Sequence, residues 1–392
     1  MPETGSQMSR GAQANVDADE GWSLPAWTYA DPDFFAAEME RVIRPSWQVV
    51  CHESDVAQTG DWHTLDYAGE SIVVIRGSDT RLRAFTNVCR HRGSRLLDGA
   101  SGSARMLVCP YHAWTYNLDG SLRGIPLRET YGPLEVAKLG LAPVELELFQ
   151  GFIFVRLQGG GPSVAEMTAS YTDEIALYRF AELRALGRVT LRPRKVNWKN
   201  VGDNYSDGLH ITVAHPGLKC LMEDGYGVEA QDHVDKMWGP IVERPSQNLS
   251  ERAYQHFLPN VAHLPPERQR LWTYFKLWPN IAFDVYPDQI DFMQWLPVSP
   301  TETLIREIAY AIPDGRREMK AARYLNWRIN RQVNAEDTKL IGRVQSGMAS
   351  QSFSVGPLSE NEVALRNFCR RMRVLIPQAR ERSAPAAGWS RQ

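Results

Sequence analysis

The sequence of 392 residues contains no run of apolar residues long enough to cross a bilayer and has only five cysteines. A membrane-spanning helix needs about 20 predominantly apolar residues, so the sequence does not predict one. The N-terminus, MPETGSQMSRGAQANVDADEG, also lacks the apolar core of a secretory signal peptide. The cysteines are scattered and odd in number, which is typical of a reducing compartment. We therefore expect a cytoplasmic protein in which residues 1–20 form a flexible tail.

Two classes of partner also lack a sequence signal. The net charge is −2 and no basic block occurs, so we expect neither a nucleic-acid nor a membrane partner. The glycine-rich stretch from Gly159 to Pro162 lacks the GxGxxG spacing and a following helix, which favours a linker over a nucleotide site. Because no other segment offers a dinucleotide fingerprint, electrons for any redox chemistry must come from another protein.

Hydrophobic residues make up 43% of the chain and can bury a sizeable core, which predicts two domains on either side of this linker. Residues 47–158 consist of short alternating runs and turns, typical of a small antiparallel β domain. Residues 21–46 precede it as an N-terminal segment that we expect to pack on the second domain, with a helix over 32–45.

Residues 163–392 mix strands and helices. Residues 270–298 alternate in at least two strand-like runs, and 303–311 predict a further strand. Residues 316–348 predict a long helix, and 360–377 predict a terminal helix opened by a capping box of Ser359 with Glu362. The fold class expected for the whole chain is α+β, with an antiparallel sheet packed against helices in the second domain.

Four potential metal ligands occur between residues 89 and 112. Cys89 and His91 form a CxH pair, Cys109 and His112 form a CxxH pair, and seventeen residues separate the two pairs. Two thiolates and two imidazoles suit a [2Fe–2S] cluster in which histidines replace two of the usual cysteines and raise the reduction potential. Trp114 lies where it could shield such a cluster from water. A zinc site remains the alternative, although zinc ligands more often come as CxxC or HxxxH pairs.

A second set of potential ligands lies in VNWKNVGDNYSDGLHITVAHPG, where Asp207, His210 and His215 follow a DxxHxxxxH pattern. On a regular helix His215 would point away from His210. Pro216 disfavours the helical backbone at His215, so the helix can end there and both imidazoles can turn towards one metal. Two imidazoles and one carboxylate suit an Fe(II) ion with open coordination positions.

Asp207 is one candidate for the carboxylate, and Asp337 is the better one. In the predicted helix AEDTKLIGRVQSGM, Asp337 shares its face with the apolar residues Leu340, Ile341, Val344 and Met348. A carboxylate on an inward face is costly unless it is paired or binds a metal. The neighbouring Glu336 has no such placement. Hydrogen-bonded histidines and a paired aspartate remain the alternative for each motif alone, and their joint occurrence with the cluster motif favours the metal site.

CRHRG, CPYHAW and NWKNVGDNYSDGLHITVAHPG together resemble the large (alpha) subunit of the Rieske non-haem iron oxygenases over roughly residues 25–377. The resemblance implies a Rieske cluster at the four ligands above, catalytic iron at His210, His215 and Asp337, and O2 as co-substrate. It also implies an NAD(P)H-dependent reductase partner, with or without a ferredoxin. Asp207 matches the acid that connects a Rieske histidine, here His112, to the iron-ligand histidine of a neighbouring subunit, which implies a homotrimer.

The substrate is less well indicated. The resemblance is nearest to alpha-only members that oxidise quaternary ammonium compounds of the betaine, choline or carnitine type, often releasing a methyl group as formaldehyde. Members acting on carnitine tend to have Glu as the bridging acid, where this chain has Asp207. An aromatic cage would bind such a cation, and candidates for the pocket are Asn204, Trp238, Trp272, Tyr274, Phe283, Tyr286, Phe292 and Trp295.

Three alternatives stay open. The enzyme could hydroxylate, dihydroxylate or O-demethylate an aromatic acid, which needs a basic pocket residue such as Lys199, Lys276 or Arg306. A Rieske electron carrier would need the cluster but not the second ligand set. A zinc-stabilised binding protein would need neither iron site.

Overall fold

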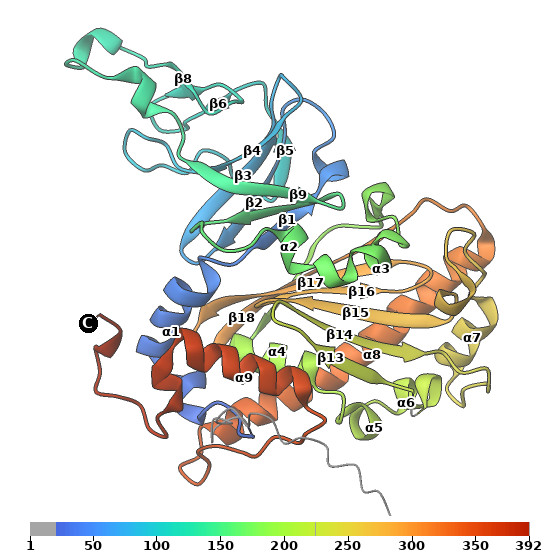
Figure 1. The fold of residues 1–392 in the computed structure, drawn as a ribbon. Coiled ribbons are helices and arrows are strands. Elements are labelled where there is room, and N and C mark those ends of the chain that lie inside the picture. The colour runs from blue at the N-terminus through green and yellow to red at the C-terminus, as the bar shows by residue number, and fades with distance from the viewer. Residues whose placement is uncertain (1–20, 224, 392) are drawn as a thin grey trace, which may run out of the picture.

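The computed structural model describes residues 21–223 and 225–391, so the tail expected at residues 1–20 lies outside the described residues. Two sheets stacked one above the other dominate the ribbon in Figure 1. The upper sheet and its loops carry the cysteine and histidine pairs, and the lower sheet with its helices carries the second ligand set. This arrangement confirms the α+β class and the predominance of antiparallel pairing.

The upper sheet has seven antiparallel strands in the order β1-β10-β9-β4-β3-β2-β5. Their bounds are β1 Gln48–His52, β2 Asp61–Tyr67, β3 Glu70–Arg76, β4 Leu82–Thr86, β5 Ser101–Ser103, β9 Pro143–Phe149 and β10 Phe152–Arg156. A small sheet beside it consists of β6 Leu107–Val108, β7 Thr115–Tyr116 and β8 Leu122–Gly124. A separate hydrophobic core lies between the seven-stranded upper sheet and this small sheet. It includes Trp62, Phe85, Cys89, Cys109 and Trp114.

The lower sheet contains eight strands. Seven follow the order β11-β18-β17-β16-β15-β14-β13, and β12 also pairs with β18. Their bounds are β11 Arg184–Ala185, β12 Thr190–Arg194, β13 Gly227–Ala230, β14 Val234–Pro240, β15 Leu271–Leu277, β16 Ile281–Val285, β17 Ile290–Ser299 and β18 Glu302–Ala311. Residues 270–298 therefore contribute three strands, and the strand predicted at 303–311 is β18.

The longest helix, α8 (Arg317–Met348), runs across one face of the lower sheet, and α2 (Val164–Met167) and α3 (Thr172–Ala176) lie on the side of the upper sheet (Figure 1). The other helices of this region are α4 Trp198–Ser206, α5 Ile211–Ala214, α6 Pro216–Met222, α7 Leu249–Phe257 and α9 Val363–Leu375. No helix in the described ranges is both long and apolar enough to cross a membrane.

The N-terminal segment contacts the lower half of the molecule. Helix α1 (Pro32–Glu38) begins after Asp31, whose side chain accepts a hydrogen bond from the Phe34 N–H at 2.7 Å, and continues as a π-helical turn, Met39–Ile43. Glu38 is fully buried and forms an ion pair of 2.6 Å with Lys199 on α4. The helix predicted over 32–45 is thus two consecutive helical pieces anchored by a buried charge pair.

The capping box predicted at the terminal helix is wrong. Helix α9 begins at Val363, so Glu362 and not Ser359 is the residue that precedes it. The Glu362 carboxylate accepts a hydrogen bond from the Ser359 N–H at 2.6 Å, but the Ser359 hydroxyl accepts from Asn361. These contacts close a turn before the helix.

Candidate active site

The chain reverses direction twice between α4 and α6. Helix α4 ends at Ser206 because Asp207 adopts an extended backbone. His210 precedes the single turn of α5, and His215 leaves the helical region at φ −118° and ψ 76° before Pro216 opens α6. The proline therefore breaks the helix as the sequence predicts, and the two imidazoles point towards each other instead of to opposite sides of one helix.

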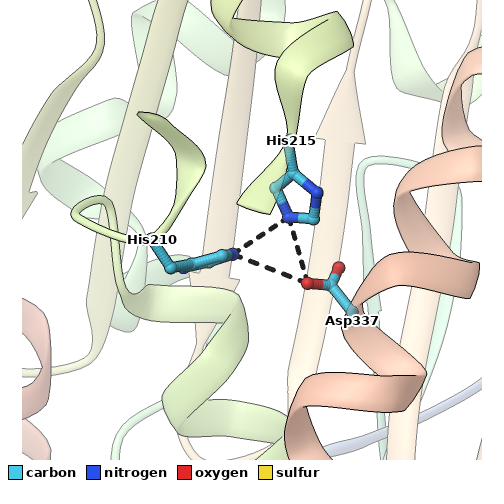
Figure 2. Close-up of side chains that lie close together, drawn as sticks. All are labelled: His210, His215 and Asp337. Atoms are coloured by element: carbon cyan, nitrogen blue, oxygen red, sulfur yellow. Dashed lines mark hydrogen bonds and ion pairs between the residues drawn. The ribbon is translucent and has the colours of Figure 1, made fainter. Parts of the chain in front are cut away.

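His210, His215 and Asp337 converge, as Figure 2 shows. The Nε2 atoms of the two histidines are 3.0 Å apart, and Asp337 Oδ1 lies 3.0 Å from His215 Nε2 and 3.5 Å from His210 Nε2. Asp337 comes from α8, which packs against α4. One ligand atom from each residue thus faces a common point.

The chemistry of this donor set fits a divalent metal ion. Asp337 Oδ1 is buried and has no well-directed hydrogen bond, although two imidazoles surround it. Burial would raise the pKa of Asp337, but the contacts with His210 and His215 outweigh it and lower the pKa to about 2. An ionised carboxylate between two imidazole nitrogens is the donor set of two-histidine, one-carboxylate Fe(II) centres.

Two further carboxylates hold the outer nitrogens of the histidines. Asp207 Oδ2 lies 3.2 Å from His210 Nδ1, and Glu336 Oε2 lies 2.7 Å from His215 Nδ1. Asp337 and not Glu336 belongs to the converging donor set, but the sequence analysis assigned Glu336 no role, and His215 inserts beside α8 and meets both members of the Glu336-Asp337 pair. Apolar periodicity predicts the buried face only in part, because Ile341 of the predicted stripe is buried but Val344 is 46% exposed, and it misses a polar group from another segment that reaches the edge of that face.

Cys89 and Cys109 lie on two similar turns at the end of the upper half of the molecule. Both are buried, at 2% and 3% exposure. Gly93 N–H donates to Cys89 C=O and Ala113 N–H donates to Cys109 C=O, each at 3.0 Å. Gly93 and Ala113 have φ of 73° and 54°, the left-handed conformation that closes each turn.

The two histidines of these turns are His91 and His112, whose ring centroids are 4.8 Å apart. Their Nδ1 atoms are buried without a hydrogen-bond partner, an arrangement that is costly unless a metal binds there. Trp114 stacks on His91 at 4.9 Å with an interplanar angle of 6°. Two thiols and two unsatisfied imidazole nitrogens at one place fit a [2Fe–2S] cluster with mixed ligands, with Trp114 covering one side.

A cavity of about 540 Å³ adjoins His210, His215 and Asp337. Of the candidate pocket residues, Asn204, Tyr274, Tyr286 and Phe292 line it, whereas Trp238, Trp272, Phe283 and Trp295 do not. The sequence analysis missed other lining residues, above all Tyr205, Tyr226, Asp284 and Asp291.

Strand register explains this division except at Phe292, which borders the cavity although it pairs with Phe283 and packs against Phe152. In β15, β16 and β17 the row Tyr274, Asp284 and Asp291 faces the cavity, whereas Phe283 packs against Phe152 of the upper sheet, with ring centroids 4.9 Å apart. Trp238 lies over Lys236 on the side of α3. Trp295 is on the cavity side but is fully buried under α4, against Tyr205. Alternation in a strand can be read from sequence, but which face meets the cavity depends on the register.

Asp284 and Asp291 are directly opposite each other on β16 and β17. Tyr205 and Tyr286 donate hydrogen bonds to Asp284, and Gln289 donates to Asp291 at 2.7 Å. In the part of the chain that the structure describes, neither carboxylate has an ion pair with Lys, Arg or His. Burial raises the pKa of Asp284 to about 7 and raises that of Asp291 well above its usual range. Two opposed, partly buried acids are costly unless a proton or a cation accompanies them.

Comparison with known families agrees with both metal sites. Residues 46–140 match the Rieske [2Fe-2S] domain, and residues 180–378 match the catalytic domain of the ring hydroxylating alpha subunit. The chain belongs to the Rieske oxygenase alpha subunits. It is therefore an O2-dependent oxidoreductase that carries a Rieske [2Fe–2S] domain and a non-haem iron catalytic domain.

Relatives of this Rieske oxygenase include the carnitine monooxygenase oxygenase subunit of Escherichia coli. It is 31% identical over 349 residues, which cover 86% of this chain and 87% of that protein. The glycine betaine monooxygenase oxygenase subunit of Chromohalobacter salexigens is 36% identical over 198 residues, covering 50% of this chain and 44% of that protein. The solved structure of a quaternary ammonium Rieske monooxygenase superposes with a TM-score of 0.77 at 25% identity, covering 91% of this chain and 96% of the other.

The family assignment decides between the classes left open by the sequence. A catalytic domain that matches ring hydroxylating alpha subunits contradicts both the pure electron carrier and the zinc-stabilised binding protein. As the terminal oxygenase component, this Rieske oxygenase implies a separate reductase component.

Proposed function

We propose that this Rieske oxygenase binds its catalytic iron through His210, His215 and Asp337 and its cluster through Cys89, His91, Cys109 and His112. When bound, the iron activates O2 and the cluster supplies electrons to it. The convergent donor atoms and the unsatisfied imidazole nitrogens described above support these ligand sets.

We further propose that the substrate is a small quaternary ammonium compound of the betaine, choline or carnitine type. The composition of the cavity carries this proposal, because tyrosines and two partly buried carboxylates surround the space beside the metal ligands. Aromatic faces attract alkylammonium ions, and a cation would also offset the charges of Asp284 and Asp291. The names of the E. coli and C. salexigens relatives agree with this substrate class.

Removal of one N-methyl group as formaldehyde balances as follows. One oxygen atom of O2 enters a C–H bond of the methyl group, and the other leaves as water with two electrons from the reductase and two protons. The resulting N-hydroxymethyl group then loses its O–H proton and breaks at its C–N bond, so that the nitrogen keeps the bonding electron pair as the amine and formaldehyde leaves. The role of the cavity is to hold the ammonium group so that one methyl faces His210, His215 and Asp337.

Oxidation of an aromatic acid is the alternative that the cavity supports less well. Lys199, Lys276 and Arg306 do not line the cavity: Lys199 pairs with Glu38, Lys276 with Asp235, and Arg306 donates to Gln294. Four arginines do line it. Arg192 and Arg323 are partly buried and already engaged, Arg192 with Glu307 at 3.0 Å and Arg323 with two backbone carbonyls, whereas Arg188 and Arg331 are exposed and could bind a carboxylate. Exposed side chains bind an anion less strongly than buried ones would, because water competes.

The inter-subunit bridge is a further part of the proposal. Strand β6, which leads into Cys109 and His112, and helix α5 lie at opposite ends of the ribbon (Figure 1), so the cluster turns are remote from Asp207 of the same chain. We propose a homotrimer in which Asp207 of one subunit accepts hydrogen bonds from its own His210 and from a neighbour's His112. A carboxylate between two imidazoles fixes both tautomers and shortens the electron route.

The substrate class can be tested by comparing the binding of choline with that of 3,3-dimethylbutan-1-ol, in which an uncharged carbon atom replaces the choline nitrogen. Calorimetry should show choline binding at least about tenfold tighter, a difference of roughly 1.4 kcal/mol. Asp284→Asn should remove most of that preference and leave the iron content unchanged. Equal binding of the two ligands, or tighter binding of benzoate than of choline, would contradict a quaternary ammonium substrate.

A further inference from the structure

His215 is held at both ring nitrogens by neighbouring residues of one helix. Its Nε2 faces Asp337 at 3.0 Å, and its Nδ1 faces Glu336 at 2.7 Å. His215 is 2% exposed, so water does not compete for either nitrogen. Because successive helical residues point about 100° apart, the Glu336-Asp337 pair can contact the two edges of a single imidazole.

The glutamate is itself fixed in place. Gln332, one turn earlier on α8, donates from Nε2 to Glu336 Oε1 at 2.8 Å. With one oxygen on Gln332 and the other on His215, the carboxylate has little freedom to rotate. An ionised carboxylate only accepts hydrogen bonds, so Nδ1 of His215 must carry the proton and Nε2 presents its lone pair to the metal position.

The second histidine has a different partner. Nδ1 of His210 faces Asp207 at 3.2 Å, and Asp207 is 23% exposed. Glu336 is equally accessible, at 24% exposure, but it also accepts from Gln332 of its own helix, whereas Asp207 also accepts from the Leu209 N–H and is the residue assigned above to the proposed contact between subunits. The two carboxylates thus occupy equivalent positions on the two histidines but differ in their further partners.

We propose that Glu336 is a positioning residue that holds His215 as a metal ligand and so retains the catalytic iron. This inference rests on the proposed iron site. A carboxylate on the outer nitrogen of a metal-binding histidine fixes the tautomer and makes the ligand more basic, and its loss typically weakens metal binding about 10–100-fold. Asp207, by contrast, serves electron transfer, so the two outer carboxylates divide retention and reduction between them.

Chelator titration of the purified full-length protein tests this division. Iron per chain is measured after equilibration with increasing concentrations of an Fe(II) chelator, and the visible bands of the cluster report whether the chain stays folded. Glu336→Ala should lose its non-cluster iron at a chelator concentration about 10–100-fold lower than the wild type. Glu336→Gln should lie between the two, because an amide oxygen still accepts a hydrogen bond but carries no charge.

Two control variants distinguish a specific effect of Glu336 from the general effect of removing an acidic side chain. Glu318→Gln, an exposed change in the first turn of the same helix, should match the wild type. Asp207→Asn, the matched amide change on the other histidine, should keep its iron more firmly than Glu336→Gln, because Asp207 lies 3.2 Å from His210 whereas Glu336 lies 2.7 Å from His215. The electron paramagnetic resonance signal of the ferrous nitric oxide adduct should change in Glu336→Ala and stay unchanged in Glu318→Gln, which reports ligand geometry independently of turnover.

Retention of iron by Glu336→Ala at wild-type chelator concentrations would overturn this inference and leave the proposed iron site standing. A wild type that holds only the cluster irons would instead overturn the iron site and the inference together.

Discussion

A buried ion pair joins the N-terminal segment of this Rieske oxygenase to α4. Lys199 is fully buried beside Glu38 at 2.6 Å, and its ammonium group also donates to the Thr28 carbonyl at 2.9 Å. The pair links the N-terminal segment to α4, the helix that leads into Asp207 and His210. Loss of this pair should therefore lower the stability of the whole protein and not only loosen one contact.

Lys199→Met should destabilise the protein by about 3–5 kcal/mol, because it leaves the Glu38 carboxylate buried without its cation. Burial raises the pKa of Glu38 and Lys199 opposes that rise, so removing Lys199 raises the pKa further. A folded state that binds a proton more tightly than the unfolded state gains stability as the pH falls. Urea unfolding from pH 8 to pH 5 should show the variant recovering part of its loss, and a loss that is constant over this range would contradict the explanation.

Regular elements were the part of the fold that could be predicted from sequence. The helix predicted at 316–348 is α8, Arg317–Met348, because its apolar periodicity runs without proline or an interior break. The helix over 360–377 is shorter, Val363–Leu375, because the Glu362 carboxylate accepts from the Ser359 backbone and closes a turn instead. Capping patterns specify a local hydrogen bond, but a turn can satisfy the same bond.

The candidate site could be predicted where a local sequence pattern places the side chain. It could not be predicted where strand pairing brings distant residues together. Pro216 gave the orientation of His215, and Asp337 was found from its position on an apolar face. Asp284, Asp291 and Tyr226 were missed because only the pairing of β13 to β17 brings them into the cavity. Glu336 was missed because its partner, His215, comes from a distant segment.

Substitutions on the two faces of the lower sheet test which face borders the cavity. Phe283→Ala removes a buried ring that packs against Phe152 and should cost about 3–5 kcal/mol of stability. Because Phe283 faces away from the cavity, choline affinity measured by calorimetry below the unfolding transition should stay unchanged. Tyr274→Ala, on the adjacent strand but on the cavity face, should weaken choline binding. A loss of affinity in Phe283→Ala as large as in Tyr274→Ala would place both residues in the pocket.

Within one chain the cluster turns lie far from the catalytic site. We therefore expect electrons to pass from the cluster of one subunit to the iron site of its neighbour, so that activity requires the assembled trimer. Asp207→Asn should abolish most turnover because it removes the proposed bridge, and His112→Ala should do so because it removes a cluster ligand. Each variant keeps the part that the other lacks. If electrons cross between subunits, refolded or co-expressed mixtures of the two should contain interfaces with an intact cluster on one side and an intact bridge on the other.

Formaldehyde release from choline checks this expectation. Mixed trimers should recover a substantial fraction of wild-type activity, whereas each variant assembled alone should stay inactive. Mixtures that remain as inactive as the separate variants, with subunit exchange verified by mass spectrometry, would indicate that electrons pass within one chain.

The iron and acid-labile sulfide content of the wild type and of His210→Ala shows whether the chain holds both a [2Fe–2S] cluster and a separate iron. Two sites predict three irons and two sulfides per chain in the wild type, and loss of one iron in the variant with the cluster absorption bands intact. Two irons in both proteins, or zinc in place of iron, would contradict the assignment of His210, His215 and Asp337 as the catalytic iron site.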